Sequence, residues 1–171
     1  MIKRVLGKFL HIIAFVAPFG NTFRPFIHRM RGVKIGKNVW ISLYVYLDEI
    51  HPECISIGDN STIGLRTSII SHTYFGLPKK NNPNKVIIGK NVYIGPHCLI
   101  LPNVRIGDGA VIKGGSVVTR NVPPNILWGE PSAEPLAMVS VPLTPETSYD
   151  EFLRGLKPLH KKKKKLEDFS K

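Results

Sequence analysis

The sequence contains few cysteines and few acidic residues. Of its 171 residues only two are cysteines, Cys54 and Cys98, and they form no CxxC or other paired spacing. A disulfide framework or a zinc knuckle is therefore not expected, and the simplest interpretation of the cysteine content is a protein of the reducing cytoplasm. Asp and Glu number 12 against 24 Lys and Arg, which gives a formal net charge of +12. This excess favours anionic partners such as phosphorylated ligands, membrane surfaces or nucleic acid.

The sequence also lacks an apolar run of the roughly 20 residues that a membrane span requires. The longest candidate, FLHIIAFVA at 9–17, is short and is interrupted by His11. It follows Lys3, Arg4 and Lys8, so it faintly resembles a signal peptide. We expect instead that residues 1–32 form a basic amphipathic helical extension, which lies on a membrane or on the protein's own end.

A six-residue period dominates the centre of the chain. Because six is a multiple of two, strand alternation survives the repeat, and a residue and its neighbour two positions earlier point the same way. Turn signals rich in Gly and Asn separate the aliphatic positions, and both residues accept a positive φ. The pattern predicts a parallel β-helix whose short strands stack coil on coil. The expected interior residues are Ile88, Ile94, Ile100, Ile106, Ile112 and Val118, with Val86, Val92, Cys98, Val104, Ala110 and Ser116.

The length of one coil can be read from a recurring corner, Ile-Gly-(Lys or Asp)-(Asn or Gly). The last two corners are three hexapeptides apart, which we take as the length of a regular coil. The two earlier coils exceed this length by four and by thirteen positions, and we assign the extra chain to 48–53 and 73–85. The longer excess is expected to be a protruding loop, a common location of functional residues, and His72 directly precedes it. The corners begin at Ile35, Ile57, Ile88 and Ile106.

Residues 141–171 are expected to form a C-terminal extension. Ser148 and Glu151 have the spacing of a capping box, which predicts a short helix that includes Leu156 and closes before Pro158. Five lysines follow at 161–165. Such a run is usually a solvated tail, although it could also contact anionic lipid together with the N-terminus. Nucleic acid is not an expected partner, because the basic residues are not interspersed with aromatic residues and no known nucleic-acid-binding motif is present.

Four segments carry a resemblance to a known family. They are IGDNSTIG (57–64), IGKNVYIG (88–95), GGSVVTRNVPPN (114–125) and GEPSA (129–133). Together they resemble the left-handed β-helix hexapeptide acyltransferases, and most of all the galactoside, maltose and capsular-polysaccharide O-acetyltransferases. The resemblance implies a left-handed parallel β-helix over 33–140. It also implies a homotrimer with active sites between adjacent subunits, acetyl-CoA as acyl donor, and no required metal.

The same resemblance implies direct acyl transfer in a ternary complex, without a covalent enzyme intermediate. A base must take the acceptor's proton, and an imidazole with a pKa near neutral suits that task. The family's catalytic histidine matches His72, although the family usually has proline where this chain has Thr73. His97 could line the substrate site or lie on the surface, and His51 could reach a ligand. His11, His28 and His160 are expected to be solvated, and a zinc site of three converging histidines is not expected.

The match to the family also implies the contacts of CoA and of the acceptor. Small residues with free backbone amides would let the pantetheine arm lie against the coils, although corner geometry alone also accounts for the glycines. The residues expected to contact the acyl donor CoA, here called the donor-side candidates, are Tyr93, Gly95, Lys113, Gly114, Thr119 and Arg120. On the acceptor side, Asp48 matches an Asp that holds sugar hydroxyls. The family's Asn has no counterpart near Leu43, so we expect a diverged acceptor site.

These expectations define one leading function and two alternatives. The leading hypothesis is a cytoplasmic, trimeric, acetyl-CoA-dependent O-acyltransferase that acts on a sugar of a surface polysaccharide or its precursor. Peripheral contact with an anionic membrane is a further expectation. The alternatives are an N-acetyltransferase acting on a nucleotide-linked amino sugar, and a non-catalytic β-helix that serves as a scaffold.

Overall fold

The structure is a computed structural model that divides the chain into two compact units. The first unit is Met1–Glu130 and the second is Pro131–Lys171. The described residues are 2–72, 84–129, 137–141 and 148–158.

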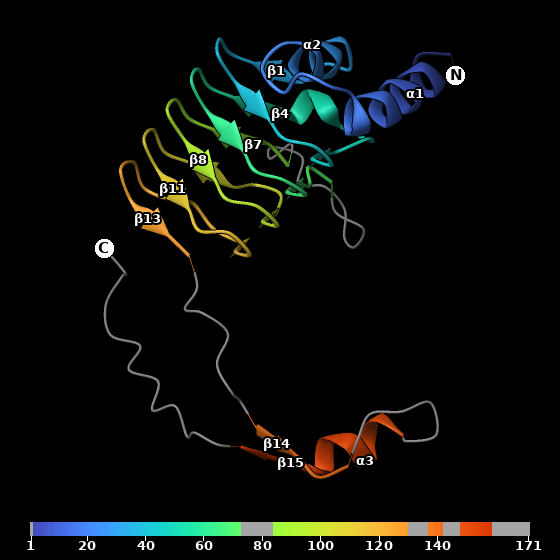
Figure 1. The fold of residues 1–171 in the computed structure, drawn as a ribbon, viewed down its shortest axis with the longest axis vertical. Coiled ribbons are helices and arrows are strands. Elements are labelled where there is room, and N and C mark those ends of the chain that lie inside the picture. Colours follow the sequence, from blue (N-terminus) through green and yellow to red (C-terminus); the bar gives the residue numbers. More distant parts are fainter. Residues whose placement is uncertain (1, 73–83, 130–136, 142–147, 159–171) are drawn as a thin grey trace. The chain divides into compact units, whose positions relative to one another are not determined.

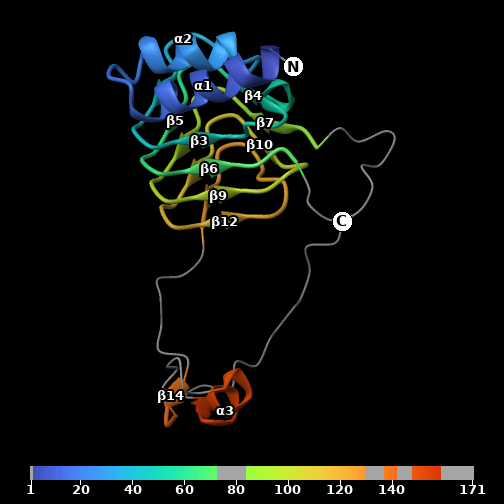
Figure 2. The ribbon, with the colours of Figure 1, turned by 90° about the vertical axis from the view of Figure 1, so that its right-hand side faces the viewer.

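The first unit is a parallel β-helix with two helices at its N-terminal end, α1 (Ile2–Val16) and α2 (Phe23–Met30). Three parallel sheets form its walls, and successive strands of the chain belong to sheets A, B and C in turn (Figures 1 and 2). This order, with the parallel register of every pair in these sheets, confirms the predicted parallel β-helix. Sheet A contains β1 (Lys34–Ile35), β4 (Ile55–Ile57), β7 (Val86–Ile88) and β10 (Arg105–Ile106). Sheet B contains β2 (Trp40–Ile41), β5 (Thr62–Ile63), β8 (Tyr93–Ile94), β11 (Val111–Ile112) and β13 (Leu127–Trp128). Sheet C contains β3 (Tyr46–Leu47), β6 (Ser68–Ile69), β9 (Leu99–Ile100) and β12 (Val117–Val118).

The strand register confirms the coil lengths that the corners predicted. In sheet A, Ile35 pairs with Ile57, Ile57 pairs with Ile88, and Ile88 pairs with Ile106. Each interval between corners therefore spans one coil, and stacked residues of successive coils are 22, 31 and 18 positions apart in sequence. Both excesses fall where the chain passes from sheet C to sheet A. The 3-10 helix η1 (Pro52–Cys54) occupies the first, and residues 73–83 of the second lie outside the described part of the chain.

The interior of the β-helix is filled as the six-residue period predicts. All twelve side chains expected inside expose 3% or less of their surface. Each coil contributes aliphatic residues that lie directly over those of the next coil, as Leu47, Ile69, Ile100 and Val118 do in sheet C. Burial of this apolar surface is the main source of stability in such a solenoid.

Asparagines line the corner between sheets A and B. Asn38, Asn60 and Asn91 all adopt a positive φ, and their amides form a ladder with donor–acceptor distances of 3.2 Å. The corner between sheets B and C, here called the B/C corner, is built differently. There the positive-φ positions are Tyr44 (58°) and His97 (57°), with Arg66 between them in the stack at 56°. Residues with large side chains rarely adopt this conformation.

The two N-terminal helices cover the first coil, as Figure 2 shows. Ala14, Ala17 and Ile27 form a small core between them, with Leu10 and Ile13 packed against it. The buried Arg24 side chain links the helical cap to the β-helix. Its Nε donates to the backbone carbonyl of Ile41 and its Nη1 to that of Ala17, each at 2.7 Å.

Two histidines of the helical cap are buried, so the expectation that they are solvated is wrong. His11 is 8% exposed and its ring packs edge-on against Tyr46, while His28 is fully buried. Burial, with a smaller contribution from the nearby Arg31, lowers the pKa of His11 to about 4 and that of His28 to about 3. Both imidazoles are therefore neutral at physiological pH, and the basic cap buries them in that form.

The second unit contains the helix α3 (Tyr149–Arg154) and the antiparallel strands β14 (Ala137–Val139) and β15 (Leu156–Pro158). The capping box is confirmed, because Glu151 N–H donates to Ser148 Oγ and Ser148 N–H donates to Glu151 Oε2. The expected position of Leu156 in the helix is wrong, since the helix ends at Arg154 and Leu156 pairs with Val139. His160 and the lysines at 161–165 lie outside the described residues.

Candidate active site

The turns from sheet C to sheet A, here called the C/A corner, bring together a carboxylate and an imidazole. Asp48 follows β3 in the first coil and His72 follows β6 in the second. His72 Nδ1 lies 2.5 Å from Asp48 Oδ2. An ionised carboxylate only accepts hydrogen bonds, so Nδ1 carries a proton, and in the neutral imidazole the lone pair is then on Nε2. His72 is 8% exposed, so its side chain is buried where β6 ends.

The Asp48 carboxylate is completely buried and has four hydrogen-bond partners among the described residues. Its Oδ1 accepts from the backbone N–H groups of Ile50 (2.8 Å) and His51 (3.0 Å). Its Oδ2 accepts from Ser71 N–H (2.7 Å) as well as from His72. Burial raises the pKa of Asp48, but these hydrogen bonds outweigh it and hold the pKa below its usual range. The carboxylate is therefore ionised and fixed in orientation.

The extra residues after β3 create this arrangement. They turn the chain so that two backbone N–H groups face Asp48 Oδ1, and they place the carbonyl of His51 where Ser71 Oγ donates to it at 2.7 Å. The helical cap also contacts the backbone of this turn. Arg31, at the end of α2, donates from Nη2 to the carbonyls of Leu47 (2.9 Å) and Asp48 (2.8 Å). The first two coils and the cap thus share one hydrogen-bond network around Asp48.

Two donor-side candidates lie on the same corner. Thr119 and Arg120 follow β12 in the fourth coil, before Val122 bridges back to β10 in sheet A. Coils stack at the strand spacing of about 4.8 Å, so these residues are about 10 Å along the corner from the coil of His72. Both are exposed, and the Arg120 guanidinium lies 5.5 Å from the ring centre of Trp128.

The remaining donor-side candidates do not lie on the C/A corner. Tyr93 projects from sheet B and is half exposed. Gly95, Lys113 and Gly114 belong to the B/C corner, which is at the other edge of sheet C, and His97 lies on the same turn as Gly95. Within one chain, the residues expected around CoA therefore divide between two edges of the solenoid.

Stacking alone explains the glycine at position 95. A Cβ atom placed on Gly95 would lie 2.4 Å from the backbone nitrogen of Gly114 and 2.7 Å from its Cα atom. Real Cβ atoms do not approach backbone so closely, so the corners of consecutive coils require glycine there whether or not a ligand binds.

The other histidines are not part of the Asp48–His72 pair. His51 is exposed, with its Nδ1 3.1 Å from Glu53 Oε1, and His97 is an exposed corner residue. Among the described residues, no three His, Cys, Asp or Glu side chains cluster as a metal site would require. No helix in the described part of the chain is long and apolar enough to cross a membrane.

The unequal coil lengths are a signal in the sequence for the Asp48–His72 pair. Because the first coil is longer than three hexapeptides, Leu47 pairs with Ile69 and Asp48 lies over Ile70. His72 follows Ile70 almost directly. The match to the family had assigned Asp48 to the acceptor, whereas in the structure all four hydrogen bonds of its carboxylate are made within the chain. The roles of Arg31 and Ser71 had no sequence signal, because both depend on contacts between coils and the cap.

Comparison with known proteins gives consistent matches. The family described as bacterial transferase hexapeptide (six repeats) matches residues 85–120, and the hexapeptide repeat of succinyl-transferase matches residues 54–73. The YvoF protein of Bacillus subtilis, an acetyltransferase by name, is 38% identical over 127 residues, which cover 74% of this chain and 73% of that protein. The galactoside O-acetyltransferase of Escherichia coli is 34% identical over 100 residues, 56% of this chain and about half (48%) of the relative.

Solved structures show the same fold. A galactoside acetyltransferase in complex with coenzyme A superposes with a TM-score of 0.50 at 28% identity, covering 73% of this chain and 75% of that one. The hexapeptide-repeat acetyltransferase VCA0836 of Vibrio cholerae superposes with a TM-score of 0.54 at 21% identity, covering 72% of this chain and 79% of that one. With the six-residue period, the stacked parallel coils and the match to YvoF, these similarities establish that the chain belongs to the hexapeptide-repeat acetyltransferase family.

Proposed function

We propose that the protein transfers an acetyl group from acetyl-CoA to a sugar hydroxyl, with His72 as general base. The observation that carries this proposal is the hydrogen bond between His72 Nδ1 and the buried, ionised Asp48. In the neutral imidazole it directs the Nε2 lone pair away from the carboxylate, as a general base requires. Asp48 is the positioning residue, because it fixes the tautomer and stabilises the imidazolium that forms.

The proposed reaction is a direct transfer between two bound substrates. Nε2 of His72 takes the proton of the acceptor hydroxyl as its oxygen forms a bond to the thioester carbonyl carbon. The tetrahedral intermediate then collapses, the carbon–sulfur bond breaks, and the imidazolium returns the proton to the departing CoA sulfur. The products are the acetyl ester and free CoA, and the enzyme ends in its starting protonation state.

Acetyl-CoA as the donor is supported by the family and by the galactoside acetyltransferase structure that contains coenzyme A. Arg120 is the proposed phosphate contact. It is exposed on the corner of His72 and about 10 Å along it, so a long donor could have its thioester at His72 and its phosphates near Arg120. The guanidinium is also suited to bidentate phosphate binding.

A homotrimer is proposed because the donor-side candidates divide between two edges of one chain. A cyclic arrangement that places the C/A corner of one chain against the B/C corner of the next would unite His72 and Arg120 with Gly114, Lys113 and Tyr93 of its neighbour. Such head-to-tail contacts close into a ring when the rotation allows it. Light scattering should give three chain masses for the active species, and a fully active monomer would overturn the shared site.

The acceptor is proposed to be a sugar of a surface polysaccharide or its precursor, modified in the cytoplasm. A galactoside O-acetyltransferase among the relatives supports a sugar, and two free cysteines suit a reducing compartment. Release of free thiol from acetyl-CoA across a panel of sugars and nucleotide-linked amino sugars would identify the acceptor. A product that alkali cleaves is an ester, whereas a resistant product is an amide and would favour N-acetylation.

Paired substitutions test the roles of His72 and Arg120. His72→Ala should lower turnover about 10²–10⁴-fold and leave CoA affinity nearly unchanged, because the imidazole acts on the acceptor's proton. Arg120→Ala should weaken CoA binding with a smaller effect on turnover. His97→Ala is the comparison variant, because His97 is an exposed histidine on the B/C corner that the proposed trimer brings toward His72. Loss of turnover in His97→Ala with normal turnover in His72→Ala would assign the base to His97.

A further inference from the structure

The helices α1 and α2, with the turn between them, present a set of large apolar side chains to solvent. Each of these side chains exposes between 42% and 68% of its surface. We call this set the outer face. It consists of Leu6, Phe9, Ile12, Val16, Phe19, Phe23, Phe26 and Met30.

The outer face is separate from the face by which the helices cap the β-helix. Ala14, Ala17 and Ile27 already pack inward and expose 5% or less. On α2, the outer residues Phe23 and Phe26 alternate with inward residues such as Ile27 along the turns of the helix. A cap needs one apolar stripe on each helix. The second stripe is therefore not explained by folding of the first unit.

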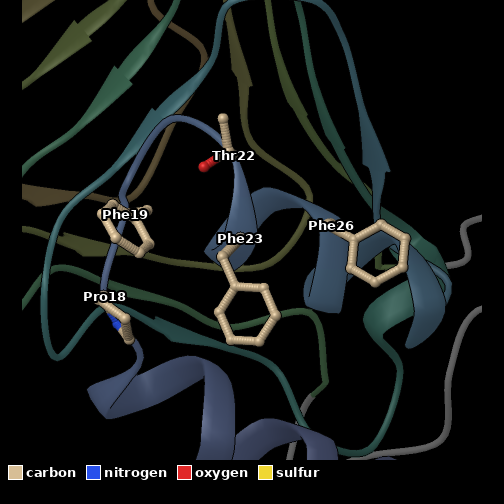
Figure 3. A pocket seen from close by; sticks show the side chains of 5 residues that line it. All are labelled: Pro18, Phe19, Thr22, Phe23 and Phe26. Carbon is tan, nitrogen blue, oxygen red and sulfur yellow. The ribbon is translucent and has the colours of Figure 1, made fainter.

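An open hollow lies within the outer face, as Figure 3 shows. It has a volume of about 460 Å³ and is lined by Pro18, Phe19, Thr22, Phe23 and Phe26. The phenyl rings in Figure 3 extend from the turn and from successive turns of α2, and Thr22 provides the single hydroxyl. With aromatic walls and almost no polar groups, the hollow suits hydrocarbon rather than a polar ligand.

The charge around the outer face selects between possible occupants. Residues 1–47 contain eight Lys and Arg and no Asp or Glu. Among these, Lys8, Arg29 and Lys34 are exposed. A second copy of the chain would bring an equally basic surface against this one, and the like charges would repel. Anionic lipid instead complements both features, with headgroups for the basic residues and acyl chains for the apolar ones.

We propose that the outer face docks on an anionic lipid surface, with α1 and α2 lying in the plane of the interface. The described helices cannot cross a bilayer, and α1 has only 15 residues. Docking there would hold the cap against the lipid. The first coil, which contains Asp48, is attached to that cap through Arg31 at the end of α2.

The test is co-sedimentation of the full chain with vesicles, which requires no catalytic activity. Vesicles of phosphatidylcholine alone are compared with vesicles that also contain phosphatidylglycerol. The test variant is Phe23→Ser with Phe26→Ser, and the matched control is Ile126→Ser with Leu127→Ser. The control residues expose 42% and 73% of their surface at the other end of the β-helix. Circular dichroism confirms that each variant is folded.

We expect the wild type to bind the phosphatidylglycerol vesicles, and added salt to weaken binding. The Phe variant should bind at least about tenfold more weakly, because each ring buries a large apolar area. The control should bind like the wild type. Absence of wild-type binding, or equal binding by the folded Phe variant, would overturn the proposal. Self-association in lipid-free solution that the Phe substitutions abolish would also overturn it, since the outer face would then be a protein–protein interface.

Discussion

Replacing Asp48 by asparagine changes one atom of the site and reverses one hydrogen bond. The carboxylate accepts from Ile50 N–H and His51 N–H through Oδ1, and from Ser71 N–H and His72 Nδ1–H through Oδ2. An asparagine has one accepting oxygen and one donating NH₂ group. Whichever way the amide is oriented, two of these four donors face an NH₂ group.

The oxygen of the introduced amide should stay with Ile50 and His51, because a flip would leave two backbone N–H groups unpaired. The NH₂ group then faces Ser71 N–H and His72. The imidazole can restore its bond only by accepting through Nδ1, which moves its proton to Nε2. The base is then blocked, and turnover should fall about 10²–10⁴-fold. The unpaired Ser71 N–H should also lower the free energy of unfolding by about 1–3 kcal/mol.

Thiol release from acetyl-CoA in the presence of the identified acceptor measures turnover, and thermal unfolding measures stability. The matched comparison is His72→Ala alone and combined with Asp48→Asn. If the two residues act as a unit, the double variant should be no slower than His72→Ala. Near-normal turnover in folded Asp48→Asn, or additive losses in the double variant, would refute the role of Asp48 in setting the tautomer.

Two further predictions concern the fold. The pKa values of His11 and His28, about 4 and 3 in the folded chain, lie below the unfolded value, so their neutral forms stabilise the fold above pH 6.5 and the benefit is lost as pH falls. Between pH 7.5 and 5 the free energy of unfolding should drop by up to about 2 kcal/mol for each histidine. His28→Gln should remove about half of that drop in chemical denaturation, and an unchanged pH dependence would contradict the assignment. Gly95→Ala should destabilise the chain by about 1–3 kcal/mol or more, because its Cβ meets backbone at 2.4 Å. In the control Gly7→Ala the new Cβ would meet no atom within 4 Å beyond its chain neighbours and its own helix backbone, so this change should be neutral or slightly stabilising. Equal effects of the two substitutions would show that stacking does not require the glycine at position 95.

The sequence predicted those parts of the fold that repeat. The six-residue period identified the interior side chains, and the spacing of the corners gave the lengths of the first three coils, because both follow from stacking strands in register. The positions of single irregular elements were harder to predict. The burial of His11 and His28 depends on how the helical cap packs on the first coil, which no local pattern encodes. Leu156 has helical spacing from Phe152 and Leu153, but pairing with β14 overrides it.

The candidate site was predicted only in part for the same reason. His72 could be located because it precedes an interruption of a regular pattern. Its hydrogen bond with Asp48 depends on the unequal lengths of two coils. A match to the family compares single positions, so it does not show that these two residues are neighbours. The division of the CoA candidates between two corners likewise required the assignment of each turn to its sheets.

The two insertions into the regular coil of three hexapeptides lie at the C/A corner, and the strands on either side keep their register. The fourth coil, in which Ile106 pairs with Val122, is instead shorter than three hexapeptides. The C/A corner therefore acts as an insertion point at which chain length is uncoupled from folding. The entropy of closing a loop grows slowly, by about 0.6 kcal/mol for each doubling of its length. The segment between β6 and β7 can consequently be lengthened, shortened or exchanged at small cost, while Ile57 still stacks on Ile88. If His72 is the base, as proposed, a chimera that exchanges this segment between two relatives should change acceptor preference and keep the stability of the parent β-helix.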